Sequence, residues 1–224
     1  MLNYGKYTVS GGYYEGNYLL KDKSEVTQKE YDGGIKYGYK HVFDLHFKYI
    51  DFEKEDAKVY FVGYGLNLYD IGFETSFAYS NYSSFNVYQA EFTPYMWLVD
   101  DYLKFGIGVG YKFFSDDKFD KTAFVQSYLN YYATKSFWVS LYLIYNEKTH
   151  FVSNKGLSVQ STGEEVVLNG NLTLNIKVKN FILSPYYQTY FYNGKEDFMN
   201  KYSYGLTFGI CILIGIFPLH FLIK

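Results

Sequence analysis

The fold is decided by residues 103–113, LKFGIGVGYKF, in which apolar residues alternate with small or charged ones. Leu103, Phe105 and Ile107 begin one phase of the pattern, and Lys104 and Gly106 begin the other. A period of two places successive side chains on opposite faces of a β-strand. The stretch therefore predicts a strand with one apolar face and one face of small or charged residues.

The same period recurs along most of the chain. Residues 31–39 and 43–50 alternate on either side of a phase slip at 40–42, where a short turn fits. The high contents of Tyr (29) and Phe (21) also favour strands over helices. Strands are predicted near 4–14, 31–39, 43–50, 58–68, 71–80, 85–97, 102–113, 122–132, 137–146, 166–178, 181–192 and 202–212.

The connections between these strands alternate in length. The longer and more polar ones lie around 15–30, 51–57, 81–84, 114–121, 147–165 and 193–201, although 81–84 is short. The tight ones lie at 40–42, 69–70, 98–101, 133–136 and 179–180. Long loops on one side and short turns on the other are typical of transmembrane barrels. We therefore predict an all-β fold, a transmembrane antiparallel up-and-down β-barrel of about 12 strands, closed by pairing the first strand with the last, with both termini on the periplasmic side. Ten strands are the alternative.

The placement of charge indicates which solvent surrounds the barrel. The predicted strands hold only 11 of the 44 charged residues (21 basic and 23 acidic), and ten of these share the polar phase. The exception, Lys58, opens its strand, where a long side chain can snorkel toward lipid headgroups. A lysine facing lipid at mid-membrane costs roughly 2–4 kcal/mol, and the pattern obeys that penalty. The apolar phase is thus expected to contact the lipid bilayer; a soluble lipocalin-like binder is the alternative outside membranes.

Composition excludes other classes of protein. All 21 basic residues are Lys and the net charge is −2, so the electrostatic footprint of a nucleic-acid-binding protein is absent. The single cysteine, Cys211, excludes an internal disulfide framework. We expect no cofactor. Because Met1 leads into the sequence without a secretory signal, a signal peptide is expected to have been removed or to lie upstream.

The chain resembles bacterial outer-membrane β-barrel proteins as a broad class. The resemblance covers residues 4–212 by pattern, and the stretches QAEFTPY at 89–95 and YGLTFG at 204–209 look like pieces of such proteins. It implies a location in the bacterial outer membrane and insertion by the outer-membrane assembly machinery. Members typically end in a strand with a terminal aromatic residue, whereas this chain continues into an apolar tail. We therefore divide the chain into a barrel, 1–212, and a tail of unclear role, 213–224, which fits an extended last strand, a short membrane-associated helix or a shifted reading frame.

The polar phase supplies the candidate functional residues, because it would face the lumen of the barrel. Charges inside are costly when isolated, so these groups are expected to pair with one another or with water. A satisfied network that stiffens the barrel and a lining that selects solutes both remain open. Inward tyrosines would narrow a pore or offer a stacking surface for a sugar or nucleoside: Tyr128, Tyr132, Tyr142, Tyr186 and Tyr190. The predicted lumen residues are Asp32, Lys36, Asp44, His46, Lys48, Glu74, Gln89, Glu91, Lys104, Lys112, Gln126, Asn171, Asn175, Lys177 and Gln188.

The leading functional prediction is a narrow passive or substrate-specific channel for small polar solutes. Twelve strands lie between eight-stranded barrels, which enclose little more than side chains, and sixteen-stranded ones, which hold a water channel. The runner-up is a non-conducting structural or adhesive barrel that acts through its extracellular loops. An outer-membrane lipid hydrolase comes third, because Ser127 lies on the predicted lipid face but no His is obviously across from it. We do not expect the protein to be an enzyme, and we disfavour a metal site at His46 with Asp44 or Glu74.

Overall fold

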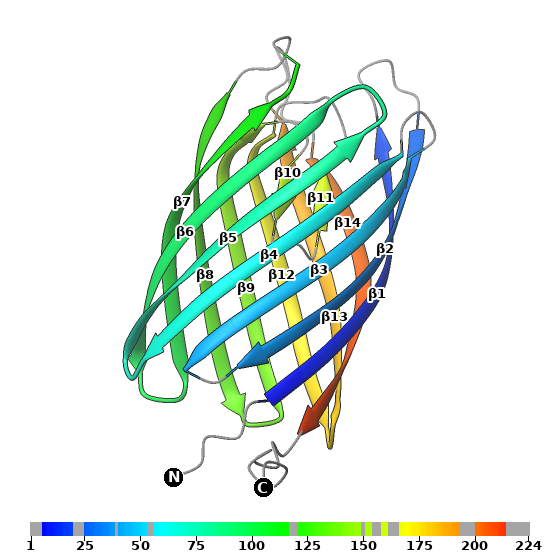
Figure 1. Ribbon diagram of the computed structural model, residues 1–224. Coiled ribbons are helices and arrows are strands. Elements are labelled where there is room, and N and C mark those ends of the chain that lie inside the picture. The colour runs from blue at the N-terminus through cyan, green and yellow to red at the C-terminus, as the bar shows by residue number, and fades with distance from the viewer. Residues whose placement is uncertain are drawn as a thin grey trace, which may run out of the picture.

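The alternating stretches of the sequence form β-strands that pair antiparallel with their neighbours (Figure 1). The computed structural model describes residues 6–19, 25–38, 40–52, 56–116, 121–148, 151–153, 158–160, 166–192 and 200–213. Within these ranges, no helix is long and apolar enough to cross a membrane. The strands are β1 (Lys6–Leu19), β2 (Glu25–Gly38), β3 (His41–Phe52), β4 (Ala57–Leu68), β5 (Ile71–Tyr82), β6 (Asn86–Val99), β7 (Leu103–Phe114), β8 (Thr122–Thr134), β9 (Phe137–Lys148), β10 (Phe151–Ser153), β11 (Ser158–Gln160), β12 (Val166–Val178), β13 (Phe181–Tyr192) and β14 (Asn200–Leu213).

All of these strands except β10 and β11 belong to one closed barrel. Its strands follow one another in chain order, and the first pairs with the last from Lys6 opposite Leu213 to Glu15 opposite Tyr204. The prediction of a closed, up-and-down barrel of 12 strands is therefore confirmed. The ten-stranded alternative is wrong, because both β1 and β14 pair on each of their edges.

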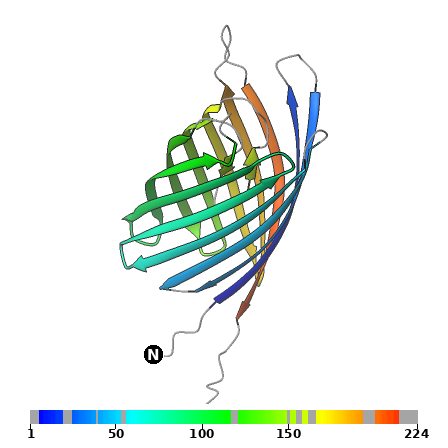
Figure 2. The ribbon, with the colours of Figure 1, turned by 45° about the horizontal axis from the view of Figure 1, so that its top comes forward.

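The two ends of the barrel differ in their connections. Residues 69–70, 135–136 and 179–180 form tight turns at the end where β1 begins and β14 finishes (Figures 1 and 2). We refer to this as the tight-turn end, and to the opposite end as the long-loop end. The apolar tail predicted at 213–224 lies outside the described residues, except for Leu213, which is the last residue of β14.

The hairpin of β1 and β2 extends further than the sequence indicated. Residues 15–30 were expected to form a loop, but β1 continues to Leu19 and pairs there with Glu25 of β2. The segment alternates poorly because charged residues occur in both of its phases, as Lys29 and Glu30 show. Backbone pairing does not require alternating side chains, so alternation in the sequence does not predict this extension of β1 and β2.

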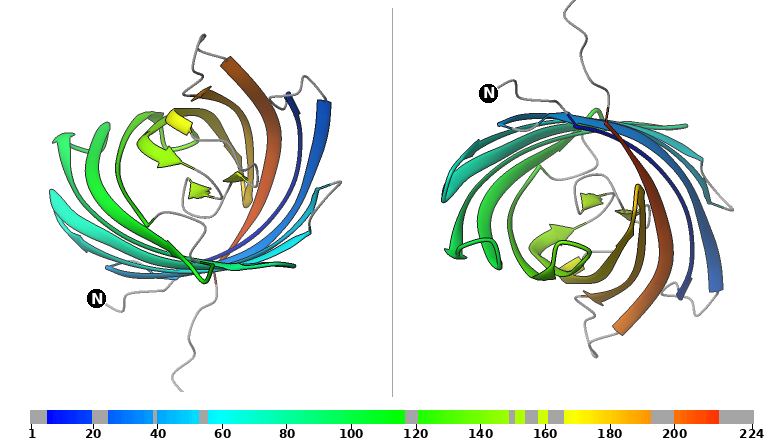
Figure 3. Two further views of the ribbon diagram at one scale, coloured as in Figure 1. Left: turned by 90° about the horizontal axis from the view of Figure 1, so that it is seen from above. Right: turned by 90° about the horizontal axis from the view of Figure 1, so that it is seen from below.

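A small hairpin, β10 paired with β11, occupies the connection between β9 and β12, where only a loop was expected. Viewed along the barrel axis, this hairpin lies inside the ring of barrel strands (Figure 3). In the side view it lies within the height of the barrel, toward the long-loop end (Figure 1). The hairpin therefore occupies part of the lumen.

The outward face of the barrel is apolar, as predicted for a surface in contact with lipid. Leu45 on β3, Val62 on β4 and Val109 on β7 are 54%, 52% and 60% exposed. Aromatic rings on this face meet across neighbouring strands, including Phe47 with Tyr60 at 5.3 Å between centroids and Tyr88 with Phe113 at 4.9 Å. Such cross-strand pairs stabilise a sheet by roughly 0.2–1 kcal/mol each.

Glycines on the inward face of β7 make room for aromatic rings of β8. Gly106 pairs with Tyr128 and Gly110 pairs with Phe124, and in each case a Cβ atom on the glycine would overlap the ring of its partner. Because Gly106 and Gly110 have no side chain, the two buried rings can lie against the inner wall of the barrel. Gly65 on β4 differs, because the nearest atom to a Cβ there would be Cγ of Glu74 at 3.6 Å, an ordinary contact.

We predict that Gly110→Ala destabilises the barrel and that Gly65→Ala does not. The methyl group at Gly110 would push Phe124 out of its seat, at a cost of about 1–3 kcal/mol for overpacking. The methyl group at Gly65 fits, and the loss of glycine from a strand interior is worth up to roughly 1 kcal/mol in the stabilising direction. Denaturant unfolding of both variants in lipid vesicles measures the difference. Equal stabilities would contradict the steric role of the glycine.

Candidate functional site in the barrel interior

The barrel interior holds the polar phase of the strands. All of the predicted lumen residues lie on the inward face, and most are buried, whereas Lys36 near the tight-turn end is 46% exposed in its side chain. Whether they bind a solute stays a prediction. These residues are Asp32, Lys36, Asp44, His46, Lys48, Glu74, Gln89, Glu91, Lys104, Lys112, Gln126, Asn171, Asn175, Lys177 and Gln188.

Strands β2 and β3 bring four predicted residues into one chain of charged contacts. Nζ of Lys36 lies 3.5 Å from Oδ2 of Asp44, whose Oδ1 lies 2.9 Å from Nε2 of His46. The other ring nitrogen of His46, Nδ1, lies 3.4 Å from Oδ1 of Asp32. Two carboxylates on opposite sides of the imidazole fix the orientation of the ring. The cluster therefore forms a polar track along the inner wall.

A fully buried ion pair lies next to this track. Nζ of Lys48 donates a hydrogen bond to Oε2 of Glu30 at 2.8 Å, and the side chains are only 2% and 1% exposed. The sequence did not indicate Glu30, because it fell in a segment expected to be a loop. Its even number places it in the polar phase of β2, so the signal was present once the strand is known to begin earlier.

Glu91 on β6 is the centre of a network of uncharged donors. Ser76 Oγ donates to its Oε2 at 3.1 Å, Gln89 Nε2 to its Oε1 at 2.6 Å and Gln126 Nε2 to its Oε2 at 3.2 Å. Gln126 in turn accepts a hydrogen bond from the hydroxyl of Tyr142. A buried carboxylate requires such partners, because each missing hydrogen bond costs about 1–3 kcal/mol or more. The network joins β5, β6, β8 and β9.

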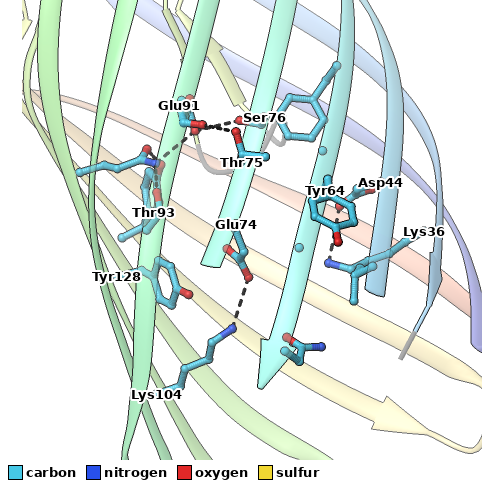
Figure 4. A pocket seen from close by; sticks show the side chains of 17 residues that line it. Lys36, Asp44, Tyr64, Glu74, Thr75, Ser76, Glu91, Thr93, Lys104 and Tyr128 are labelled. Atoms are coloured by element: carbon cyan, nitrogen blue, oxygen red, sulfur yellow. Dashed lines mark hydrogen bonds and ion pairs between the residues drawn. The ribbon is translucent and has the colours of Figure 1, made fainter. Parts of the chain in front are cut away.

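Lys104 on β7 lies among an acid and two aromatic rings. Its Nζ is 3.3 Å from Oε1 of Glu74 on β5 (Figure 4). The same nitrogen lies 3.4 Å from the ring centroid of Tyr95 and 5.4 Å from that of Tyr128. The ammonium is thus stabilised both by a carboxylate and by the negative faces of the rings.

The interior of β12 and β13 carries amides and hydroxyls in place of the paired charges of β2 to β7. Gln188 Nε2 donates to Oδ1 of Asn169 at 2.9 Å, and Ser184 Oγ donates to Oδ1 of Asn175 at 2.8 Å. Thr173 Oγ1 likewise donates to Oδ1 of Asn171 at 2.8 Å. Apart from Lys177, the inward side chains that the structure describes on these two strands are uncharged.

A cavity of about 200 Å³ lies between these groups (Figure 4). It is nearer the tight-turn end, because Lys36 is two residues from the end of β2 and Lys104 is the second residue of β7. At about 30 Å³ per water molecule, the cavity has room for several waters or one small solute. Its polar lining includes Lys36, Asp44, Asn67, Glu74, Glu91, Thr93, Lys104 and Gln126, and its aromatic lining includes Phe61, Tyr128 and Tyr142.

The lumen is polar over only part of its length, which corrects the expectation of a polar bore throughout. Toward the long-loop end, Ile50, Val59, Phe61, Val87 and Phe114 point inward and form a buried apolar cluster. Alternation did not predict this cluster, because strands such as 58–68 are apolar in both phases near this end. Side-chain packing and the β10–β11 hairpin therefore both narrow the lumen there (Figure 3).

Two weaker predictions concern chemistry. Ser127 lies on the outward face, and its cross-strand neighbours are Ile107 and Leu143, so neither can act as its general base. His46 meets Asp44 and Asp32, with Glu74 elsewhere on the wall. Among the residues that the structure describes, no group of three or more His, Cys, Asp or Glu side chains is arranged to hold a metal ion.

Similarity to known proteins lies in the fold. No protein-family model and no curated protein matches the sequence. The KdgM porin in complex with disordered oligogalacturonate matches with a TM-score of 0.58 at 13% identity, over 91% of this chain and 98% of that one. An outer membrane channel from Pseudomonas putida F1 matches with a TM-score of 0.60 at 10% identity, over 95% and 96%. The translocator domain of autotransporter NalP from Neisseria meningitidis matches with a TM-score of 0.55 at 10% identity, over 93% and 88%. The chain thus has the fold of bacterial outer-membrane β-barrels, as its pattern predicted.

We predict that Glu30→Gln destabilises the protein far more than Lys36→Gln. Removal of the Glu30 carboxylate leaves the buried Lys48 ammonium without its counter-charge, which costs about 3–5 kcal/mol in a protein interior. Lys36 is half exposed, so the loss of its contact with Asp44 costs less than about 1 kcal/mol. Denaturant unfolding in lipid vesicles compares the two. A Glu30→Gln variant as stable as Lys36→Gln would show that the buried pair contributes little.

Proposed function

We propose that this protein spans the bacterial outer membrane as a narrow channel for small polar solutes, with its tight-turn end toward the periplasm. The observation that supports this best is the cavity inside the barrel, which is bordered by acidic and basic side chains held in fixed positions by their partners. An ion or solute in such a space meets oriented polar groups instead of lipid-like walls.

The apolar cluster at the long-loop end restricts this path. Ile50 and Val59 are almost completely buried, so the side chains around them leave little free space in this conformation. The β10–β11 hairpin lies in the same half of the lumen (Figure 3). We propose that the hairpin moves to admit solute, because its two strands form a sheet of their own that is separate from the barrel sheet.

The structural neighbours give this proposal further support. One is a porin in complex with an oligogalacturonate, and another is an outer membrane channel. Both cover nearly the whole of this chain. At 13% and 10% identity, they support a barrel that can house a solute path and leave the solute open.

A non-conducting barrel that acts through its loops is the second candidate. It is favoured by the depth of burial of the inward face, where Lys112, Ile144 and Gln188 have no exposed surface. An interior that is packed in the half near the long-loop end would stiffen the barrel as a support for external segments. The long connections around 15–30 and 147–165 could bind partners or serve as solvated spacers; they lie partly outside the described residues, so their role stays a prediction.

We predict that Lys104→Gln and Glu74→Gln shift the ion selectivity of the channel in opposite directions. One unit charge at about 7 Å in water changes the energy of an ion by about 0.6 kcal/mol, or roughly threefold in its local concentration. Loss of Lys104 therefore favours cations and loss of Glu74 favours anions. Reversal potentials in planar bilayers under a salt gradient measure both shifts.

Lys58→Gln is the matched control for this experiment, because Lys58 is exposed and lies in the outward phase of β4. Its reversal potential should equal that of the unchanged protein. A barrel that inserts into the bilayer but never conducts would contradict the channel proposal and favour the second candidate. Shifts of the same sign in both cavity variants would also contradict it.

We predict that replacement of residues 151–160 by a short Gly-Ser linker raises the single-channel conductance. The change removes the hairpin from the lumen and leaves β9 and β12 paired with each other. Single-channel recordings of the unchanged and shortened proteins provide the test. An unchanged conductance would show that the hairpin does not limit the path.

A further inference from the structure

The only two tryptophans of the chain, Trp97 and Trp138, both face the interior of the barrel. Trp97 pairs with Lys104, and Trp138 pairs with Tyr132, and these partners lie in the inward phases of β7 and β8. Tryptophan in outer-membrane barrels usually lies on the outside, at the membrane interface. The inward position of both tryptophans therefore requires another explanation.

The two tryptophans belong to one group of rings. The centroids of Trp97 and Tyr132 are 5.4 Å apart, and those of Tyr132 and Trp138 are 6.1 Å apart with planes inclined by only 21°. We call these three residues the aromatic arc. All three side chains are half-buried, in contrast to the fully buried side chains nearer the long-loop end. Because they face inward, their exposed parts are accessible from the lumen.

The arc lies at the tight-turn end of the path. Tyr132 is two residues before the end of β8, and Trp138 is the second residue of β9. The backbone amide of Tyr132 donates to the carbonyl of Tyr102 and that of Trp97 donates to the carbonyl of Asp70, both within the turns at this end. A solute that crosses the barrel must therefore pass the arc as it enters or leaves.

Uncharged hydrogen-bonding groups border the arc. Asn175 lies directly opposite Trp138 on β12, and its Nδ2 lies 3.4 Å from Oγ of Ser140. Asn130 pairs with Ser140 on the next inward row. These amides and hydroxyls can both donate and accept hydrogen bonds. The border thus suits a ligand that carries many hydroxyl groups.

The lysine that pairs with Trp97 has a counter-charge. Lys104, the cross-strand partner of Trp97, is held by Glu74 at 3.3 Å. Among the side chains that the structure describes, the inward face carries five carboxylates (Glu30, Asp32, Asp44, Glu74 and Glu91) and five lysines (Lys36, Lys48, Lys104, Lys112 and Lys177), with His46 between Asp44 and Asp32. A polyanion requires a large excess of cations, which the described part of the lumen does not provide.

We propose that the aromatic arc binds a neutral saccharide ring, an inference that rests on the proposed channel and names its solute class. Sugar rings present apolar C–H faces that stack on aromatic rings, and their hydroxyl groups hydrogen-bond to amides such as those of Asn130 and Asn175. Stacking of this kind tolerates many different sugars and holds each one weakly, which allows the solute to leave again.

Tryptophan fluorescence of the refolded full-length protein in detergent tests the site directly, because both tryptophans lie in it. Titration with maltotriose, a neutral trisaccharide, should change the emission and saturate. Tyr132→Leu should weaken this binding by about tenfold, which corresponds to about 1.4 kcal/mol of stacking. Tyr132→Phe keeps the ring and should bind within about twofold of the unchanged protein. Tyr131→Leu is the matched control, because Tyr131 is the adjacent residue, faces outward and is 50% exposed; it should leave the affinity unchanged.

The possible results distinguish the site from the channel. No saturable change with maltotriose, or equal losses in Tyr131→Leu and Tyr132→Leu, would overturn the site, even if the protein conducts ions. Tighter binding of trigalacturonate than of maltotriose would overturn the neutral class. If Tyr132→Leu fails to fold, an unaltered affinity in Asn175→Ala would count against the site in its place. Saturable binding of maltotriose by a protein that never conducts would support the binding site and contradict the channel proposal.

Discussion

The structure depends on one requirement, that every backbone amide and carbonyl within the hydrocarbon layer must find a partner in the protein. Lipid offers no hydrogen bonds, and each unsatisfied group costs several kcal/mol. A sheet meets this requirement only by closing, and here the seam between β1 and β14 supplies the last set of pairs. Closure also gives the sheet an outer and an inner face. One phase of the alternating sequence therefore contacts lipid, and the other phase is enclosed.

The enclosed phase is governed by a second rule, that buried polar groups must satisfy one another. The carboxylate of Glu91 accepts hydrogen bonds from Ser76, Gln89 and Gln126, whereas Lys48 and Lys104 each have an acid within 3.3 Å. These contacts stiffen the wall and at the same time fix polar groups along the cavity. A structural network and a solute lining are therefore compatible descriptions of the same side chains.

The residue pattern was sufficient to predict the closed barrel, the number of its strands and the side chains that point inward. Alternation in 103–113 and 166–177 carries this information because lipid penalises charge on one face only. The pattern failed where charged residues interrupt the alternation. Residues 15–19 and 25–30 belong to β1 and β2 although their sequence does not alternate, and Glu30 was missed with them. The apolar cluster around Ile50 and the contact between Trp97 on β6 and Tyr132 on β8 depend on which inward side chains meet between strands, which the period alone does not reveal.

The glycine seats on β7 also bear on the diameter of the barrel. For a given number of strands, the diameter follows from the stagger between them, the shear. A slip of two residues between β7 and β8 keeps every side chain on its own face, so alternation cannot prevent it. In either direction, however, the slip would set Tyr128 against Lys104 or Phe124 against Lys112, because these lysines flank the glycine run on both sides. Two rings, three glycines and two lysines thus act as a local stop against sliding, and help to determine how wide the barrel is.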